Sequence, residues 1–148
     1  MDLGDVDRIA SGDSHLAVIA TTRADGSVQA SVVNAGMVDH PVSGERVVAF
    51  VTYGRTKLSH LRARSRVTAV FRAGWEWAAV EGGCEIVGPD DPLSGVDPSR
   101  LPDLIRAIFV AAAGSHDDWA AFDAVMAEQR RAAVFVRPER IYSNGSGP

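Results

Sequence analysis

The sequence has a single cysteine and therefore cannot form an internal disulfide. One free thiol, Cys84, is typical of proteins from a reducing compartment. No apolar run approaches the roughly eighteen residues that cross a membrane, and the acidic start Met1–Asp5 lacks the hydrophobic region of a signal peptide. We therefore expect a cytoplasmic protein that does not associate with a membrane.

Positive charge is scarce relative to negative charge. The 148 residues carry 15 Lys and Arg against 19 Asp and Glu, which gives a formal net charge of −4. This balance does not favour binding to nucleic acid or to an anionic membrane. The length predicts one domain over 1–148, large enough to bury a core, and the apolar content of 46% is ordinary for a globular protein.

Catalytic and metal-binding motifs are absent as well. The chain has no G-x-S-x-G nucleophile elbow, no P-loop and no G-x-G-x-x-G after a predicted strand. The four histidines and Cys84 lack the spacing of metal ligands, so we expect no metal site. Cys84 is interpreted as a small core residue, and Asp90-Asp91 as part of a solvated loop. Catalytic residues therefore stay unknown, and any reaction would depend on a cofactor.

The most unusual feature is the only lysine, Lys57, against fourteen arginines. It lies in Tyr53-Gly54-Arg55-Thr56-Lys57, where a strand pattern gives way to a helical one. Two cations there are unfavourable, because the N-terminus of a helix carries partial positive charge. An anion bound between them reverses that interaction, and helix N-termini are ready anion sites. The pattern indicates a bound phosphate or carboxylate, although codon usage in a GC-rich genome also makes lysine scarce.

A wider basic segment surrounds this motif. No acidic residue occurs from Arg46 to Trp75, a segment that holds seven of the fifteen basic residues. Either these side chains form a solvated basic face, or they create a local field that binds anions. Aromatic residues for base stacking do not interleave with them, which argues against a nucleic-acid partner.

Periodicity predicts an α+β chain that is mainly β. Strands are expected at 15–22, 27–38, 45–53, 67–71, 75–87, 132–136 and 140–142, and helices at 5–10, 55–64, 99–113 and 117–131. Asp25-Gly26 between two strand patterns predicts a hairpin, and Gly82-Gly83 within a strand predicts a bulge or a close backbone approach. Antiparallel neighbours with tight turns and even spacing indicate a six- to seven-stranded barrel with flanking helices.

Several stretches carry a family resemblance. They are the R-x-K of Arg55–Lys57 with the helix that follows it, the W-x-x-x-x-x-E-G strand from Trp75 to Gly82, and the segments 114–119 and 130–134. Over 15–142 the chain resembles the pyridoxamine 5′-phosphate oxidase-like split-barrel flavoproteins. Within them it is similar to a branch, common in actinobacteria, of reductases that use coenzyme F-420. The resemblance implies a split β-barrel (an FMN-binding split barrel) and a homodimer with a cofactor in each cleft between subunits.

The resemblance also implies a cofactor-binding set, which is Thr52, Arg55, Lys57, Gln29, Ser31, Val33, Asn34, Trp75 and Trp77. Arg55 and Lys57 would hold the cofactor phosphate as a fork and a point charge, with help from Thr52. The residues from Gln29 to Asn34 would lie near the ring, and the tryptophans would line a substrate pocket of a partner subunit. Simpler alternatives are an exposed strand face for 29–31 and core or dimer packing for the tryptophans. Arg62 or Arg64 would meet the carboxylates of the coenzyme F-420 tail.

Three functions stay open. The first is an oxidoreductase in which reduced coenzyme F-420 transfers a hydride to an unsaturated small-molecule acceptor. The second is an FMN-binding protein of the pyridoxamine 5′-phosphate oxidase-like type. The R-x-K motif does not separate these two, because each cofactor offers one phosphate. The third is a non-catalytic module that binds a cofactor or another small molecule.

Overall fold

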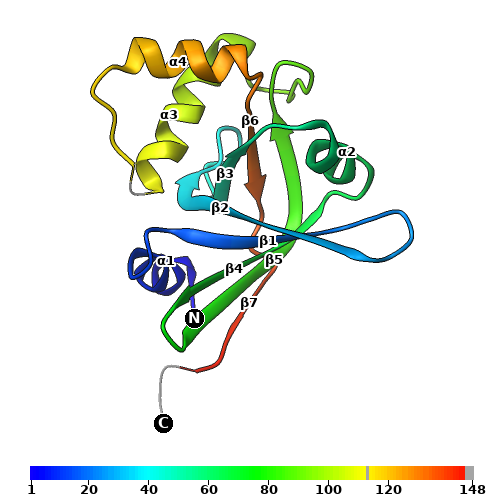
Figure 1. The fold of residues 1–148 in the computed structure, drawn as a ribbon, viewed down its shortest axis with the longest axis vertical. Coiled ribbons are helices and arrows are strands. Elements are labelled where there is room, and N and C mark those ends of the chain that lie inside the picture. Colours follow the sequence, from blue (N-terminus) through cyan, green and yellow to red (C-terminus); the bar gives the residue numbers. More distant parts are fainter. Residues whose placement is uncertain (113, 146–148) are drawn as a thin grey trace.

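The computed structural model of the chain describes residues 1–112 and 114–145 (Figure 1). Its helices are α1 (Leu3–Ser11), α2 (Arg55–Ala63), α3 (Leu101–Ala111) and α4 (Trp119–Glu128), with a 3₁₀ turn at Pro98–Arg100. Its strands are β1 (Leu16–Thr22), β2 (Val28–Asp39), β3 (Arg46–Thr52), β4 (Arg66–Ala73), β5 (Glu76–Val87), β6 (Ala132–Val136) and β7 (Arg140–Ser143). None of the helices in these residues is long and apolar enough to cross a bilayer.

The strands close into a barrel. Their order is β4-β1-β2-β3-β6-β5, a further pairing of β4 with β5 completes the ring, and β7 adds to β5. Every pairing is antiparallel. The prediction of a mainly β, six- to seven-stranded antiparallel split barrel with flanking helices is confirmed.

Two long strands divide the barrel into halves. In β2, residues 28–34 pair with β1 and residues 35–39 pair with β3. In β5, residues 76–83 pair with β4 and residues 84–87 pair with β6. Because β2 pairs with β3 only from Ala35 to Asp39, its edge from 28 to 34 has no strand partner on that side among the described residues. The barrel is therefore split between β2 and the end of β3.

The predicted close approach at Gly82-Gly83 is confirmed, because a Cβ atom on Gly82 would collide with the carbonyl oxygen of Arg137. We expect Gly82→Ala to lower the free energy of unfolding by about 2 kcal/mol, since overpacking forces the backbone apart. Gly83→Ala is the matched control, because its Cβ would lie 3.7 Å from the nearest atom, the carbonyl oxygen of Ser65. Urea unfolding measures both changes, and equal losses would contradict the assignment.

Some predicted boundaries were too long. The helix expected over 99–113 begins as a 3₁₀ turn, whose residue Ser99 donates its backbone N–H to the Asp97 carboxylate, and α3 ends at Ala111. Ala113 lies outside the described residues. The helix expected over 117–131 is capped by Asp118, as predicted for an aspartate, and ends at Glu128. Arg130 then adopts a left-handed conformation with φ 51°, which turns the chain into β6.

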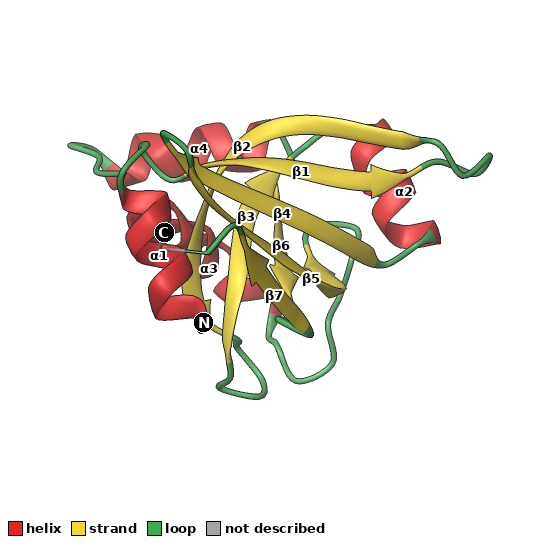
Figure 2. Cartoon of the chain, turned by 90° about the horizontal axis from the view of Figure 1, so that it is seen from below, coloured by secondary structure: helices red, strands yellow, loops and turns green. Residues whose placement is uncertain are grey.

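The helices lie on different sides of the barrel (Figures 1 and 2). Helices α1 and α2 lie on opposite sides of the barrel in Figures 1 and 2. Val6 and Ile9 of α1 and Leu61 of α2 belong to the same core cluster inside the barrel. Ile108 of α3 instead packs outside, on a second cluster that includes Ala49 of β3 and Phe135 of β6. This arrangement leaves α2, α3 and α4 around the open end of the split.

Candidate functional site

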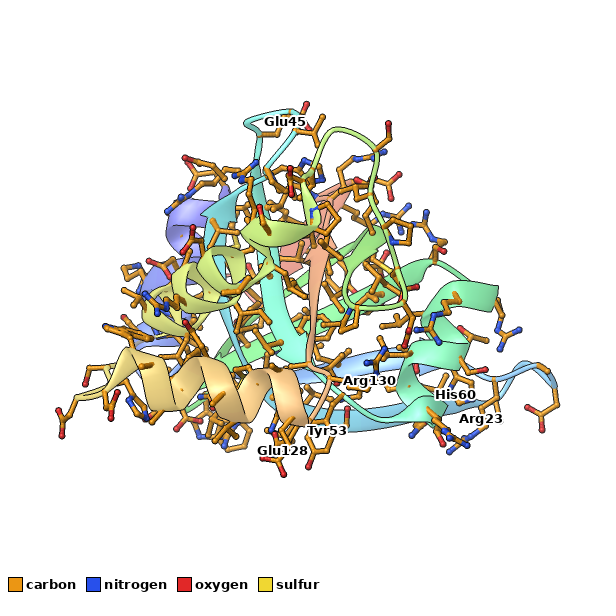
Figure 3. The ribbon with its side chains drawn as sticks, turned by 90° about the horizontal axis from the view of Figure 1, so that it is seen from above. Arg23, Glu45, Tyr53, His60, Glu128 and Arg130 are labelled. Carbon is orange, nitrogen blue, oxygen red and sulfur yellow. The ribbon has the colours of Figure 1, made fainter. Side chains whose placement is uncertain are left out.

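A cavity of about 420 Å³ lies at the split of the barrel. Strands β2 and β3, the first turn of α2, helices α3 and α4, and the residue before β6 all contribute to it. The lining residues are Val32, Val33, Asn34, Val51, Thr52, Tyr53, Lys57, Ile108, Phe109, Ala112, Phe122, Met126 and Arg131. Figure 3 shows Tyr53 between α4 and α2, at the edge of this region. The cavity thus has an apolar helical wall and a polar wall with two cations.

Lys57 is half-buried in the cavity wall. Burial lowers the pKa of its ammonium group, because the charged form loses hydration. Among the described residues, no carboxylate lies within ion-pair distance of it. A desolvated cation without a counter-ion is unfavourable, so this side chain favours an anion as its partner.

Arg131 supplies the second cation. Its guanidinium lies 3.9 Å from the centre of the Tyr53 ring, and its Nε donates to Gln129 Oε1 at 2.8 Å. Burial lowers the pKa of Arg131 too, and no carboxylate pairs with it within 1–112 and 114–145. This cation–π contact with Tyr53 favours a position of the guanidinium at the cavity. The residues individually proposed from the sequence do not include Arg131, although the segment 130–134 carries part of the resemblance.

The start of α2 adds backbone donors. Gly54 has φ 107°, a conformation that favours glycine, and it turns the end of β3 directly into the helix. The first backbone bond of the helix is from Leu58 N to Gly54 O, so the N–H groups of residues 55–57 precede the helical ladder. With Lys57, these N–H groups offer the donors that an anion site at a helix N-terminus needs, and anion binding there stays a prediction.

The structure brings four of the predicted residues into the cavity and leaves five outside its lining. Val33, Asn34, Thr52 and Lys57 line it. Gln29 and Ser31 lie farther along the same, less exposed face of β2 as Val33, and Arg55 is exposed in the first turn of α2. Trp75 lies in the turn between β4 and β5 and is 94% exposed, and Trp77 lies near the start of β5; neither lines the cavity of its own chain.

The two further arginines predicted for anion binding already have partners within the chain. Both Nε and Nη2 of Arg62 donate to Asp91, at 2.8 and 2.6 Å, so a carboxylate neutralises its charge. Arg64 donates from Nε to the carbonyl oxygen of Thr22 at 2.7 Å. The charge in the cavity therefore comes from Lys57 and Arg131.

Cys84 and His116 behave as structural residues. Cys84 is buried in the barrel core, and burial raises the pKa of its thiol to about 11, which disfavours a thiolate. His116 accepts the backbone N–H of Asp118 on Nδ1 at 3.0 Å, next to the start of α4. Within the described residues, no group of three His, Cys, Asp or Glu side chains is arranged to hold a metal ion.

The donor set fits a flat ring that carries a phosphate. Lys57, Arg131 and the α2 N-terminus suit the phosphate, while the free edge of β2 offers backbone donors and acceptors to a polar ring edge. Gln29 Oε1 is buried without a partner within the described residues, which leaves one further acceptor beside this edge. The cavity volume lies within the range of small-molecule sites.

Anion binding at Lys57 is expected to depend on pH. The pKa of Lys57 lies below the ordinary 10.5, and a bound anion favours the charged ammonium, so affinity falls as pH rises through the lowered pKa. Lys57→Arg should remove this fall, because arginine stays protonated. Titration with inorganic pyrophosphate from neutral pH towards 10.5 measures it. Superimposable pH profiles for the two proteins would exclude this role of Lys57.

Comparison with known proteins finds relatives only at the level of structure: no family model matches the sequence, and no curated protein matches it. A conserved hypothetical protein of Mycobacterium tuberculosis is similar with a TM-score of 0.68 and 18% identity, over 97% of this chain and 84% of the other. A pyridoxamine 5′-phosphate oxidase-related, FMN-binding protein of Nostoc punctiforme gives a TM-score of 0.64 and 10% identity, over 95% and 82%.

A third similar structure is an F-420 reductase, with a TM-score of 0.59 and 20% identity, over 90% of this chain and 95% of the other. All three identities are too low to transfer a cofactor or a substrate, but the similarity extends over nearly the whole chain in each case. The chain therefore has the split-barrel fold of the pyridoxamine 5′-phosphate oxidase-related proteins.

Proposed function

We propose that this protein is an oxidoreductase that uses reduced coenzyme F-420 to transfer a hydride to an unsaturated small-molecule acceptor. The observation that carries the proposal is the pair Lys57 and Arg131, two partly buried cations without carboxylate partners in the described chain, in one largely apolar cavity. The similarity in fold to an F-420 reductase supports the choice of cofactor.

In this proposal, each lining element has a task. Lys57, Arg131 and the α2 N-terminus hold the phosphate, and the free edge of β2 with Val33 and Asn34 supports the ring. Phe109, Phe122 and Met126 of the helical wall exclude water above the ring and contact an apolar acceptor. When bound, the reduced deazaflavin supplies the hydride; it is oxidised, the acceptor is reduced, and the protein supplies or admits one proton.

Coenzyme F-420 carries further carboxylates beyond its phosphate, and this favours a site with local positive charge. Arg55 is exposed at the start of α2, just outside the cavity, and has no ion-pair partner among the described residues. We propose that Arg55 meets this outer part of the cofactor, while Lys57 meets the phosphate. This assignment replaces Arg62, whose charge Asp91 neutralises.

We further propose that the protein acts as a homodimer. Val18, Val28 and Val32 are exposed on the outer face of β1 and β2, and Val32 also lines the cavity. A second copy on this face would border the cavity, as the predicted role of the exposed Trp75 requires. Sedimentation should give a dimer mass for the parent protein and a monomer mass for Val18→Glu; a monomeric parent would reject the proposal.

Turnover tests the proposed reaction. Oxidation of reduced coenzyme F-420 is followed by absorbance with a panel of activated alkenes and imines, in the parent protein and in Lys57→Ala. We expect acceptor-dependent oxidation by the parent and a large loss of its catalytic efficiency in the variant. Oxidation that is independent of protein, or equal in both proteins, would reject the proposal.

FMN is the second candidate cofactor, and the similarity in fold to an FMN-binding protein favours it. Its single phosphate would use the same cations, so the spectrum of the purified protein separates the two: stoichiometric bound FMN supports this alternative. The third possibility is a non-catalytic binding protein, which the absence of an acid–base pair among the cavity-lining residues supports. Tight cofactor binding without turnover across the acceptor panel supports that one.

A further inference from the structure

The turn Gly88–Asp91, which follows β5, is closed by two backbone hydrogen bonds and packs against β6. Gly88 N donates to Asp91 O and Asp91 N donates to Gly88 O, both at 3.1 Å. The turn also packs against the start of β6, since a Cβ atom on Gly88 would lie 2.8 Å from the Cβ of Ala132. Ala132 directly follows Arg131, so the turn lies beside one cation of the cavity.

Asp91 joins this turn to α2. Its carboxylate accepts both Nε and Nη2 of Arg62, and the Asp91 side chain is only 16% exposed. The prediction of a solvated loop at Asp90-Asp91 is therefore wrong for Asp91, because an arginine distant in sequence covers it. The same contact raises the pKa of Arg62. Arg62 lies on α2, the short helix whose first turn carries the cavity cation Lys57.

Asp90 joins the same turn to the end of α4. Its Oδ1 accepts Nη2 of Arg130 at 2.6 Å, and Arg130 is the residue before Arg131. The left-handed conformation of Arg130 directs the chain from α4 into β6. Two adjacent aspartates thus hold arginines that belong to the two segments bearing Lys57 and Arg131.

We propose that the 88–91 turn is a positioning element that sets the spacing of Lys57 and Arg131 and so selects the phosphate-bearing form of the cofactor. This inference rests on the proposed function and assigns positioning roles to Asp90 and Asp91. Two like charges in one cavity repel each other when no anion lies between them. The bidentate contact of Asp91 with Arg62 and the contact of Asp90 with Arg130 oppose that separation from outside the cavity.

The change in anion affinity on replacing Asp91 distinguishes a positioning role from a purely electrostatic one. Asp91→Asn deletes a negative charge and releases the positive charge of Arg62, which by electrostatics alone strengthens binding of an anion. The positioning role predicts weaker binding, because α2 and Lys57 lose their contact with the turn. The sign of the change therefore distinguishes the two.

The experiment compares ligands with and without the phosphate. Four proteins are compared: the parent, Asp91→Asn, Asp91→Glu and Glu76→Gln. Each is titrated with two pairs of ligands, coenzyme F-420 with its phosphate-free deazaflavin core, and FMN with riboflavin. Glu76 is the matched control, because it accepts a bidentate contact from Arg8 between α1 and β5, away from the cavity. Thermal unfolding of each protein without ligand records any general loss of stability.

We expect Asp91→Asn to reduce the preference for the phosphorylated member of a pair about tenfold, with the phosphate-free member bound as in the parent. Asp91→Glu should restore most of the preference, and Glu76→Gln should keep it whole. An unchanged or increased preference in Asp91→Asn, or an equal decrease in Glu76→Gln, would overturn the positioning role alone. A parent protein that does not prefer the phosphorylated member of either pair would overturn the proposed phosphate site itself.

Discussion

Lys57→Ala is expected to weaken binding of coenzyme F-420 about 100-fold, which corresponds to about 2.8 kcal/mol. The loss is large because Lys57 is partly desolvated in the cavity wall. When the ammonium group is removed, few water molecules can reach the bound phosphate to take over its hydrogen bonds. The remaining cation, Arg131, stacks on Tyr53 and does not move freely into the vacated position. Fluorescence titration of the deazaflavin measures the dissociation constant.

Two variants control for this result. Lys57→Arg keeps the charge and should recover most of the affinity, although its planar fork differs in shape from an ammonium group. Arg72→Ala removes an exposed cation of the same basic segment, outside the cavity lining, and should change affinity by about twofold or less. Similar losses in Lys57→Ala and Arg72→Ala would mean that net charge, and not the cavity, governs binding.

Leu61→Ala is expected to have the largest effect on stability, a decrease of about 3 kcal/mol in the free energy of unfolding. Leu61 is fully buried in the barrel core, and Leu58 is the other buried residue of α2. Shortening the side chain leaves a cavity under a helix of nine residues. Because this helix carries Lys57, cofactor affinity should fall together with stability.

Chemical denaturation compares Leu61→Ala with Ser59→Ala, an exposed position on the same helix. The control should stay within about 0.5 kcal/mol of the parent protein. A decrease below about 1 kcal/mol in Leu61→Ala would show that the α2 anchor contributes less than its burial indicates.

The sequence alone singles out Lys57 as a candidate, because the signal there is local. Five residues contain the end of a strand, a glycine and two cations in the first turn of a helix. The structure has Lys57 in the cavity wall. The barrel could also be predicted from the sequence, since alternating apolar and polar residues and the turn residues between strands predict antiparallel neighbours. The closure of the barrel through β4 and β5 follows from the hairpin between them.

Arg131 and Asp91 could not be placed in the same way, because their roles depend on contacts between distant segments. Arg131 lines the same cavity as Lys57 only because Ala132, the residue after it, pairs with Thr52 at the end of β3. The partner of Asp91 is Arg62, twenty-nine residues earlier in the chain. Local composition made Asp91 resemble a solvated loop residue and Arg62 a free cation, and the ion pair between them changes both interpretations.

The tryptophans illustrate a different reason. Trp75 is almost fully exposed, and Trp77 contacts Tyr142 at the edge of the sheet. Neither tryptophan lines the cavity of its own chain. Their predicted contribution requires a second subunit, and it stays a prediction until the assembly is measured. The roles of Gln29 and Ser31 also stay predictions, since these residues lie on the same face of β2 as Val33 but beyond the cavity lining.

The most direct test of the central claim is an equilibrium titration of the purified protein with coenzyme F-420 and, separately, with FMN, each in the parent and in the double variant Lys57→Ala, Arg131→Ala. The account predicts saturable binding of coenzyme F-420 by the parent, weaker binding of FMN, and loss of both in the double variant. Binding that survives unchanged in the double variant, or no binding of either cofactor to the parent, would contradict it.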